Sequence, residues 1–299
     1  MGASAALELN SRSRPKVVLS ISKDDLIHEN DRYSNFNKYY DRYYISMMCY
    51  NSLRDELFFL DYADFSMVRS TRLRDDQPET VNVFDFEKRY SYDEVTSVCY
   101  ISDSDTLVLT ISKSNHLVFI SRIEKGRSRD EWQEADDELI GSICCAVSDS
   151  RLLVGTSKVS YMELFRVENG PRLTLLHRIN VQEIYSDFSV SASGEELVAV
   201  SYKNSVCVNR LCHDHLEEIS RIQLSCLNLL WLGDRLLVTE SIDSHVVIEL
   251  EVRGTRLERL RELLDLKYAR IDFHCWCAVG NELAIFDDNT QALVLYSFD

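Results

Sequence analysis

The stretch IYSDFSVSASGEELVAVSYKNSVCVNRL, residues 184–211, carries the pattern that decides the fold. Phe188 and Val190 alternate with serines, which is the period-two pattern of a strand with one buried face. A turn follows at Ser193–Glu195, and its glycine suits the positive φ that tight hairpins often need. Residues 197–200, LVAV, contain no polar side chain, as expected of a strand covered on both faces. With the final apolar run VCVNRL, the stretch predicts strand, turn, strand, loop and strand.

The same pattern recurs before and after this stretch. Its marker is the first leucine of the second strand, which follows turn residues in SDSDTLVLT, SDSRLLVGT, SGEELVAVS, GDRLLVTES and GNELAIFDD. The markers are Leu107, Leu152, Leu197, Leu236 and Leu283, spaced by 45, 45, 39 and 47 residues. A third apolar run follows each marker: HLVFI, MELFRV, SVCVNRL, VVIELEV and ALVLY. Because one such unit cannot bury both of its faces alone, it needs copies of itself alongside.

A period of roughly 40–45 residues with several strands per repeat is typical of β-propeller blades. We therefore predict an all-β fold, a single closed β-propeller of six or seven four-stranded blades. It would cover residues 16–299 behind a flexible N-terminal tail, residues 1–15. A more divergent first blade contains YYISMMCY and ELFFLDYADFSMV, and its marker Leu57 lies 50 residues before Leu107. An evenly spaced β-sandwich is the alternative, which five phased copies disfavour.

Four other segments fit the repeat less directly. Residues 70–94 are polar and are expected to form a long loop in the first blade. The charged run EKGRSRDEWQEADDELIG, residues 124–141, is predicted to be a solvated loop or a short helix. Residues 253–266, RGTRLERLRELLDL, have leucines at helical spacing, and an outer strand is the alternative. The short apolar run Val17–Ile21 is expected to close the ring as the outer strand of the last blade.

Composition narrows the class of partner and the compartment. The net charge of −16 disfavours binding of nucleic acid by the chain alone and leaves binding through a partner open. The nine cysteines are odd in number and lack the spacing of a secreted disulfide scaffold, which predicts a reducing compartment, cytosol or nucleus. No apolar run reaches the length of a membrane span, and the N-terminus lacks a secretory signal pattern. The expected partner is therefore another protein, with no membrane involved.

Six residues are candidates for partner binding because aromatic and basic side chains dominate interface hot spots. They are Tyr33, Tyr39, Tyr40, Arg42, Trp132 and Lys203. The first four belong to a tyrosine-rich stretch, Glu29–Tyr44, whose alternative role is an inter-blade loop. The tryptophan stands within the charged run, where it is an unusual residue for a purely solvated segment.

No motif for catalysis or cofactor binding is present, and we predict no catalytic, cofactor or metal site. Three clusters have plausible ligand types. Cys212–His215 contains one cysteine, two histidines and an aspartate but has no matching second pair. Cys275 and Cys277 lie on a predicted strand, where alternate residues share a face, whereas Cys144 and Cys145 should point to opposite faces. An enzyme that uses carboxylates on a propeller face remains an alternative.

The blade pattern resembles that of WD-repeat proteins, although the runs VCVNRL, VVIELE and LVLYSF stand where the Trp-Asp finish would be. YSDFSVSASGEELVAVSYKNSVCVNRL and RIDFHCWCAVGNELAIFDDNTQALVLYSFD are also similar to blades of the non-catalytic WD subunit of tRNA guanine-N7 methyltransferase. That resemblance implies a subunit that stabilises the methyltransferase and lends basic residues beside the tRNA. The family's charged turn is matched here by SYKNS, which keeps only Lys203.

These observations predict a non-enzymatic scaffold or adaptor subunit that docks partner proteins in a larger intracellular complex. Its loops would be held on the two faces of the ring, where partner residues insert among them. The methyltransferase subunit is a special case with a defined partner. The propeller enzyme is the alternative from a different class.

Overall fold

The computed structural model describes the chain in the following ranges: 16–26, 45–61, 67–74, 80–85, 95–111, 116–123, 127–134, 143–148, 150–156, 159–168, 172–182, 184, 186–191, 196–240, 246–253, 256–265, 275–287 and 290–298. Within them the protein is almost entirely β-structure, with one short helix, α1 (Lys23–Leu26). No helix in these ranges has the length and apolar character that crossing a bilayer requires. The predicted tail, residues 1–15, lies outside the described residues.

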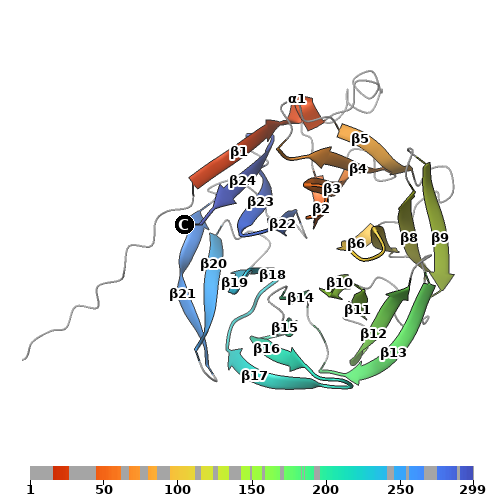
Figure 1. Ribbon diagram of the computed structural model, residues 1–299. Helices are drawn as coiled ribbons and strands as arrows, with labels where there is room; N and C mark the ends of the chain where they lie inside the picture. The colour runs from red at the N-terminus through yellow and green to blue at the C-terminus, as the bar shows by residue number, and fades with distance from the viewer. Residues whose placement is uncertain are drawn as a thin grey trace, which may run out of the picture.

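The described strands form six four-stranded blades around a common axis (Figure 1). The inner strands, which lie nearest the axis, are β2 (Ile45–Asn51), β6 (Val95–Ile101), β10 (Ile143–Ser148), β14 (Phe188–Val190), β18 (Asn228–Leu232) and β22 (Trp276–Val279). The second strands are β3 (Glu56–Asp61), β7 (Thr106–Ile111), β11 (Arg151–Gly155), β15 (Leu197–Tyr202), β19 (Arg235–Thr239) and β23 (Glu282–Asp287). Blades 1 to 6 are numbered below in the order of these inner strands.

The outer half of each blade consists of a third and a fourth strand. The third strands are β4 (Met67–Arg72), β8 (His116–Ile123), β12 (Tyr161–Glu168), β16 (Ser205–Leu211), β20 (Val246–Arg253) and β24 (Ala292–Ser297). The fourth strands are β5 (Thr80–Asp85), β9 (Arg127–Glu134), β13 (Arg172–Asn180), β17 (Leu216–Ile222), β21 (Arg256–Asp265) and, for blade 6, β1 (Lys16–Ser22). The predicted all-β propeller is confirmed, with six blades in the described residues.

The ring closes as the apolar run near the N-terminus predicts. Strand β1 pairs antiparallel with β24, so that Leu19 faces Leu295 and Ile21 faces Leu293. Each inner strand contacts the next in ring order, and β22 contacts β2. The two ends of the repeat array are therefore joined within one sheet, which removes the exposed ends that an open array would have.

The core lies in the spaces between adjacent blades, which we call seams. Each of the six seams formed by the described residues holds one cluster of buried apolar side chains. The second strands contribute to the seams on both of their faces, which explains why their central residues are apolar. In blade 4, Val198, Ala199 and Val200 are completely buried. Burial on both faces is what the LVAV pattern predicts.

Two sequence predictions for the outer rim are wrong. The expected long loop over residues 70–94 contains the end of β4 and the whole of β5, and the charged run over residues 124–141 contains β9. Outer strands expose one face to solvent, so polar and charged side chains are compatible with the pairing of their backbones. For residues 253–266 the outer-strand alternative is correct, because β21 occupies most of that segment.

Candidate functional site

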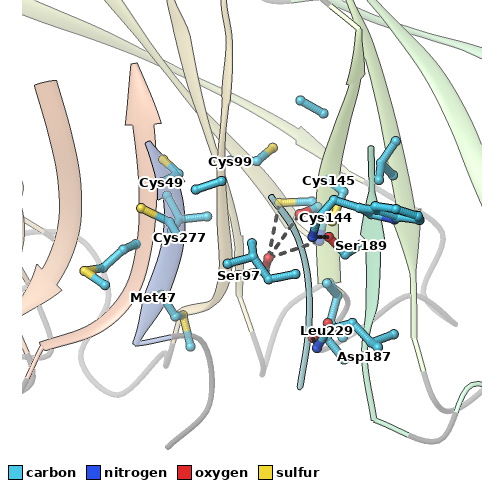
Figure 2. A pocket seen from close by; sticks show the side chains of 18 of the residues that line it. Met47, Cys49, Ser97, Cys99, Cys144, Cys145, Asp187, Ser189, Leu229 and Cys277 are labelled. Atoms are coloured by element: carbon cyan, nitrogen blue, oxygen red, sulfur yellow. Dashed lines mark hydrogen bonds between the residues drawn. The ribbon is translucent and has the colours of Figure 1, made fainter. Parts of the chain in front are cut away.

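A cavity of about 260 Å³ lies on the axis of the ring. Residues of all six inner strands line it, so it is the central channel of the propeller (Figure 2). A ligand in the channel would contact side chains from every blade at once, which makes it a natural position for a binding site. Its sulfur-bearing side chains, called the channel sulfurs below, are Met47, Met48, Cys49, Cys99, Cys144, Cys145 and Cys277.

Four inner strands carry a cysteine at the same place in the blade. Each cysteine lies opposite the residue that follows the marker leucine, in the pairs Cys49–Phe58, Cys99–Val108, Cys145–Leu153 and Cys277–Ala284. All four side chains pack in the seam with the following blade. Blades converge toward the axis, so this position favours a small apolar side chain, and a reduced cysteine is one.

Burial keeps these thiols protonated. Desolvation is the main cause that raises the pKa of Cys49, Cys145 and Cys277. The pKa of Cys99 is raised first by its hydrogen bond with Cys144 and then by burial. Because the thiolate is the reactive form of cysteine, thiols with a raised pKa are poor nucleophiles. At neutral pH these four thiols are therefore uncharged.

Two serines in the channel wall connect adjacent inner strands. The hydroxyl of Ser97 accepts a hydrogen bond from the amide of Cys144 (3.2 Å) and donates one to the carbonyl of the same residue (3.3 Å). The hydroxyl of Ser189 accepts a hydrogen bond from the amide of Trp231 (3.2 Å). These serines satisfy backbone groups at the inner edges of the blades, groups that would be costly to bury without partners.

Asp187 is the one carboxylate among the described residues that line the channel. It is buried, and its two oxygens accept hydrogen bonds from the amides of Phe188 and Leu229, both at 2.8 Å. The first amide belongs to its own blade and the second to blade 5. The carboxylate therefore fastens two inner strands to each other, and acid–base chemistry with a second carboxylate has no partner in the described wall.

One face of the ring carries the hairpins that join the inner and second strands. On this hairpin face, ion pairs connect blade 6 with blade 1 and blade 1 with blade 2. Arg74 contacts both Asp55 and Glu282, the latter at 2.7 Å, and Arg54 contacts Asp105. Because each arginine bridges to the hairpin of another blade, the pairs fix the positions of neighbouring turns.

The hairpins of blades 1 and 2 each contain a further hydrogen bond of the same kind. The phenol of Tyr50 donates a hydrogen bond to Asp55 (2.8 Å), and the phenol of Tyr100 donates one to Asp105 (2.6 Å). Both aspartates have a positive φ, 51° and 45°. Two residues before Asp55, Leu53 exposes 68% of its surface. The result is an exposed apolar side chain on a turn that ionic and phenolic hydrogen bonds hold in place.

Lys203 lies on the opposite face, at the tip of the turn between β15 and β16. Its carbonyl accepts a hydrogen bond from the hydroxyl of Ser225 (3.1 Å), and its side chain is exposed. Nearby, the guanidinium of Arg221 lies 5.7 Å from the ring centroid of Tyr202 and pairs with Glu218 at 2.7 Å. This turn therefore offers a basic and aromatic surface.

The other predicted site residues are not brought together with this turn. Trp132 belongs to β9, the outer strand of blade 2, where it pairs with Val118. The remaining candidates, Tyr33, Tyr39, Tyr40 and Arg42, lie outside the described residues.

The sequence contains three clusters of possible metal ligands, and the fold does not assemble them into a metal site within the described residues. Within the described ranges, no group of three or more His, Cys, Asp or Glu side chains is arranged to hold a metal ion. The ring of His213 instead lies 4.1 Å from that of His177 on blade 3, and His215 contacts Asp214 at 2.9 Å.

The two pairs of neighbouring cysteines compare differently with the predictions for the faces of their strands. Cys144 and Cys145 pack in different seams, as predicted. The expectation that Cys275 and Cys277 share a face is wrong, because Cys275 precedes β22 and packs with Trp276.

Sequence reasoning missed the channel sulfurs. Their signal is visible only when the blades are aligned on the marker leucine and the inner strands are compared at one position. Read singly, each cysteine is a buried apolar residue like its neighbours. The convergence of several such residues on one axis follows from closure of the ring.

No protein-family model matches the chain. No curated protein matches its sequence either. Solved structures are similar in fold: a chain of a mitotic checkpoint complex has a TM-score of 0.60 at 8% identity, covering 100% of this chain and 97% of that chain. Virginiamycin B lyase from Staphylococcus aureus has a TM-score of 0.54 at 10% identity, covering 81% and 77%. A candidate 6-phosphogluconolactonase from Bacteroides fragilis reaches 0.58 at 10% identity, covering 85% and 80%. These similarities support the β-propeller fold and extend no further.

Proposed function

We propose that this chain is a non-enzymatic β-propeller that serves as a rigid docking platform for partner proteins in a stable complex of the cytosol or nucleus. The observation that supports this role best is the hairpin face of blades 6, 1 and 2. Ion pairs tie its turns to one another, and a phenolic hydrogen bond holds each of the first two turns internally, before any partner binds. Loops that are already ordered lose little conformational entropy on association.

The docking surface centres on Leu53. Arg54 follows this leucine in the turn, and Arg74 pairs with Asp55 of the same turn. Both guanidinium groups are half-exposed, and each also contacts a carboxylate of an adjacent blade. An apolar centre within a charged rim is the usual composition of a protein–protein interface. The thiols and hydroxyls of the channel wall, in contrast, serve the packing of the ring. By analogy only, the mitotic checkpoint complex shows that a similar propeller occurs in a multiprotein assembly.

Recovery of the protein from its native extract, followed by sizing, tests this role. We expect a partner protein at fixed stoichiometry, and recovery of that partner should fall at least about tenfold with Leu53→Glu, as expected when a hot-spot residue is replaced. The matched control is Leu175→Glu, because Leu175 is also exposed (48%) but lies on the outer strand β13. A monomer without a partner, or equal recovery with both variants, would overturn the proposal.

The basic turn at Lys203 supports a second candidate, the non-catalytic subunit of a tRNA guanine-N7 methyltransferase. Lys203, Tyr202 and Arg221 place cationic and aromatic groups together on the face opposite the hairpins. In that case the recovered partner is a methyltransferase, and the pair binds tRNA more tightly than the propeller alone. Lys203→Glu should then weaken binding of tRNA by the pair while leaving the protein–protein contact intact. A partner of another class excludes this candidate and retains the platform.

A further inference from the structure

The hairpin turns of blades 1 and 2 are alike in length and differ in the side chains that they expose. The turns are residues 52–55 and 102–105, which join β2 to β3 and β6 to β7. Leu53 and Asp103 are the second residues of these turns, and both side chains are exposed. At corresponding positions, blade 1 therefore presents an apolar side chain and blade 2 presents a carboxylate.

The two turns are fastened to each other. Arg54, the residue after Leu53, contacts Asp105 of the neighbouring turn. In the seam between the same blades, the rings of Phe58 and Tyr100 stack with their centroids 6.0 Å apart. The two turns are therefore held in a fixed arrangement, and a partner segment that crosses both of them would contact both exposed side chains.

Asp103 differs from the other carboxylates of the two turns. Asp55 and Asp105 each accept a hydrogen bond from a phenol and contact an arginine. Within the described residues, Asp103 has no hydrogen bond or ion pair. The arginines are already neutralised, because Arg54 contacts one carboxylate and Arg74 contacts two. The uncompensated charge beside the exposed leucine is therefore negative.

We propose that the partner segment docked on this surface is basic, an inference that rests on the proposed function. The segment places an apolar side chain against Leu53 and a lysine or arginine against Asp103. A charge at the rim of an interface fixes the register of the partner and accelerates its association. The net charge of −16 acts in the same direction over a longer range. An acidic segment would be repelled by Asp103 and would find Arg54 and Arg74 already paired with carboxylates.

Selection of short peptides displayed on phage tests this inference, with the full chain as bait and Leu53→Glu for counter-selection. We expect the retained peptides to carry a lysine or arginine close to an apolar residue. Asp103→Asn should weaken binding of such a peptide about two- to fivefold, because exposed ion pairs are weak. Asp103→Lys should weaken it at least about tenfold, because like charges then face each other. Added salt should weaken binding to the wild type more than binding to Asp103→Asn.

The matched control is Asp234→Lys, which makes the same change of charge at an exposed residue in the hairpin turn of blade 5, on the same face. It should leave binding of the peptide unchanged. Peptides that depend on Leu53 but lack a basic residue, or that bind Asp103→Lys as tightly as the wild type, overturn the basic partner and leave the docking role intact. Equal weakening by Asp103→Lys and Asp234→Lys also overturns it. If no retained peptide depends on Leu53, the docking surface itself is overturned.

Discussion

The seam between blades 4 and 5 and the seam between blades 2 and 3 are fastened with different chemistry. In the first, the buried carboxylate of Asp187 accepts hydrogen bonds from the amides of Phe188 and Leu229. In the second, the neutral hydroxyl of Ser97 exchanges two hydrogen bonds with the backbone of Cys144. Hydrogen bonds to a charged group contribute about 1.5–3 kcal/mol each, compared with about 1 kcal/mol for neutral ones. Of the two hydrogen bonds of Asp187, only the one to Leu229 crosses the seam, so by these bonds alone the two seams are of similar strength.

The rest of each seam makes the one between blades 4 and 5 the stronger. Ser186 and Ser201 both donate hydrogen bonds to the carbonyl of Cys226, which precedes the inner strand of blade 5. At the rim, β17 pairs with β21 through Arg221 and Arg256, so blades 4 and 5 form one eight-stranded sheet. Blades 2 and 3 remain two separate sheets. A ring of equal-looking repeats thus has a strong joint and a weaker one.

Removal of the carboxylate at the stronger joint should have the largest effect on stability. Asp187→Ala leaves two buried amides without their acceptor, and we expect a loss of about 3–5 kcal/mol in the free energy of unfolding. Urea denaturation at neutral pH measures it. Asp187→Asn should lose less, because its amide oxygen still accepts one of the two hydrogen bonds.

The matched control is Asp214→Ala, which removes an exposed carboxylate on a turn. It should leave the free energy of unfolding almost unchanged, as is usual for surface substitutions. If Asp187→Ala costs no more than this control, the carboxylate does not fasten blades 4 and 5, and the contrast between the seams disappears.

Alkaline pH should weaken the stronger joint through a thiol. Burial raises the pKa of Cys226 to about 12, so the folded state keeps this proton after the unfolded state has lost it. A group with a raised folded pKa contributes stability that is lost as pH rises, here from about pH 9 upward. One such group accounts for about 2 kcal/mol between pH 9 and 11, at a limiting slope of about 1.4 kcal/mol per pH unit.

Urea denaturation across that pH range compares the wild type with Cys226→Ala. The variant should lose about 2 kcal/mol less between pH 9 and 11 than the wild type does. Cys212→Ala is the control, because Cys212 is only half-buried and lies on a turn. Parallel stability curves for the wild type and Cys226→Ala would show that this thiol does not titrate on unfolding.

The difference between the inner and outer strands explains how much of the fold the sequence predicts. Second strands such as Leu197–Tyr202 are buried on both faces, so their apolar runs identify them directly. Outer strands such as β5 and β9 have polar or charged sequences, and residues of this kind are equally compatible with a loop. Backbone pairing with the third strand determines their structure, and a local pattern does not reveal that pairing. The number of blades became clear only with these strands in place.

The candidate site was predictable to a smaller extent. Lys203 stands on an exposed turn, as the polar letters between two strands predict. The pairing of Arg54 with Asp105 joins residues 51 positions apart, and no local pattern indicates it. The same is true of Cys99 and Cys144, which share one apolar cluster only because blades 2 and 3 are neighbours in the ring. Contacts across seams depend on closure, which the repeat implies without specifying which side chains meet.

The weaker joint gives the smallest expected effect and the sharpest test of the comparison. Ser97→Ala removes both hydrogen bonds to Cys144 and leaves its amide without that acceptor, at a cost of about 1–2 kcal/mol. Hydrogen exchange resolves this effect by residue, because local opening exposes the amides of a seam before global unfolding does. In the wild type, the amide of Cys144 should exchange faster than that of Leu229.

In Ser97→Ala, exchange at Cys144 should accelerate about 5- to 30-fold, the factor that 1–2 kcal/mol represents, while exchange at Leu229 stays unchanged. Ser148→Ala serves as the control, because that serine ends the same inner strand, β10, with an exposed side chain. Equal acceleration at Cys144 and Leu229 would mean that the ring opens as one unit and has no weaker joint. Acceleration confined to Cys144 would place the first opening of the ring at the seam between blades 2 and 3.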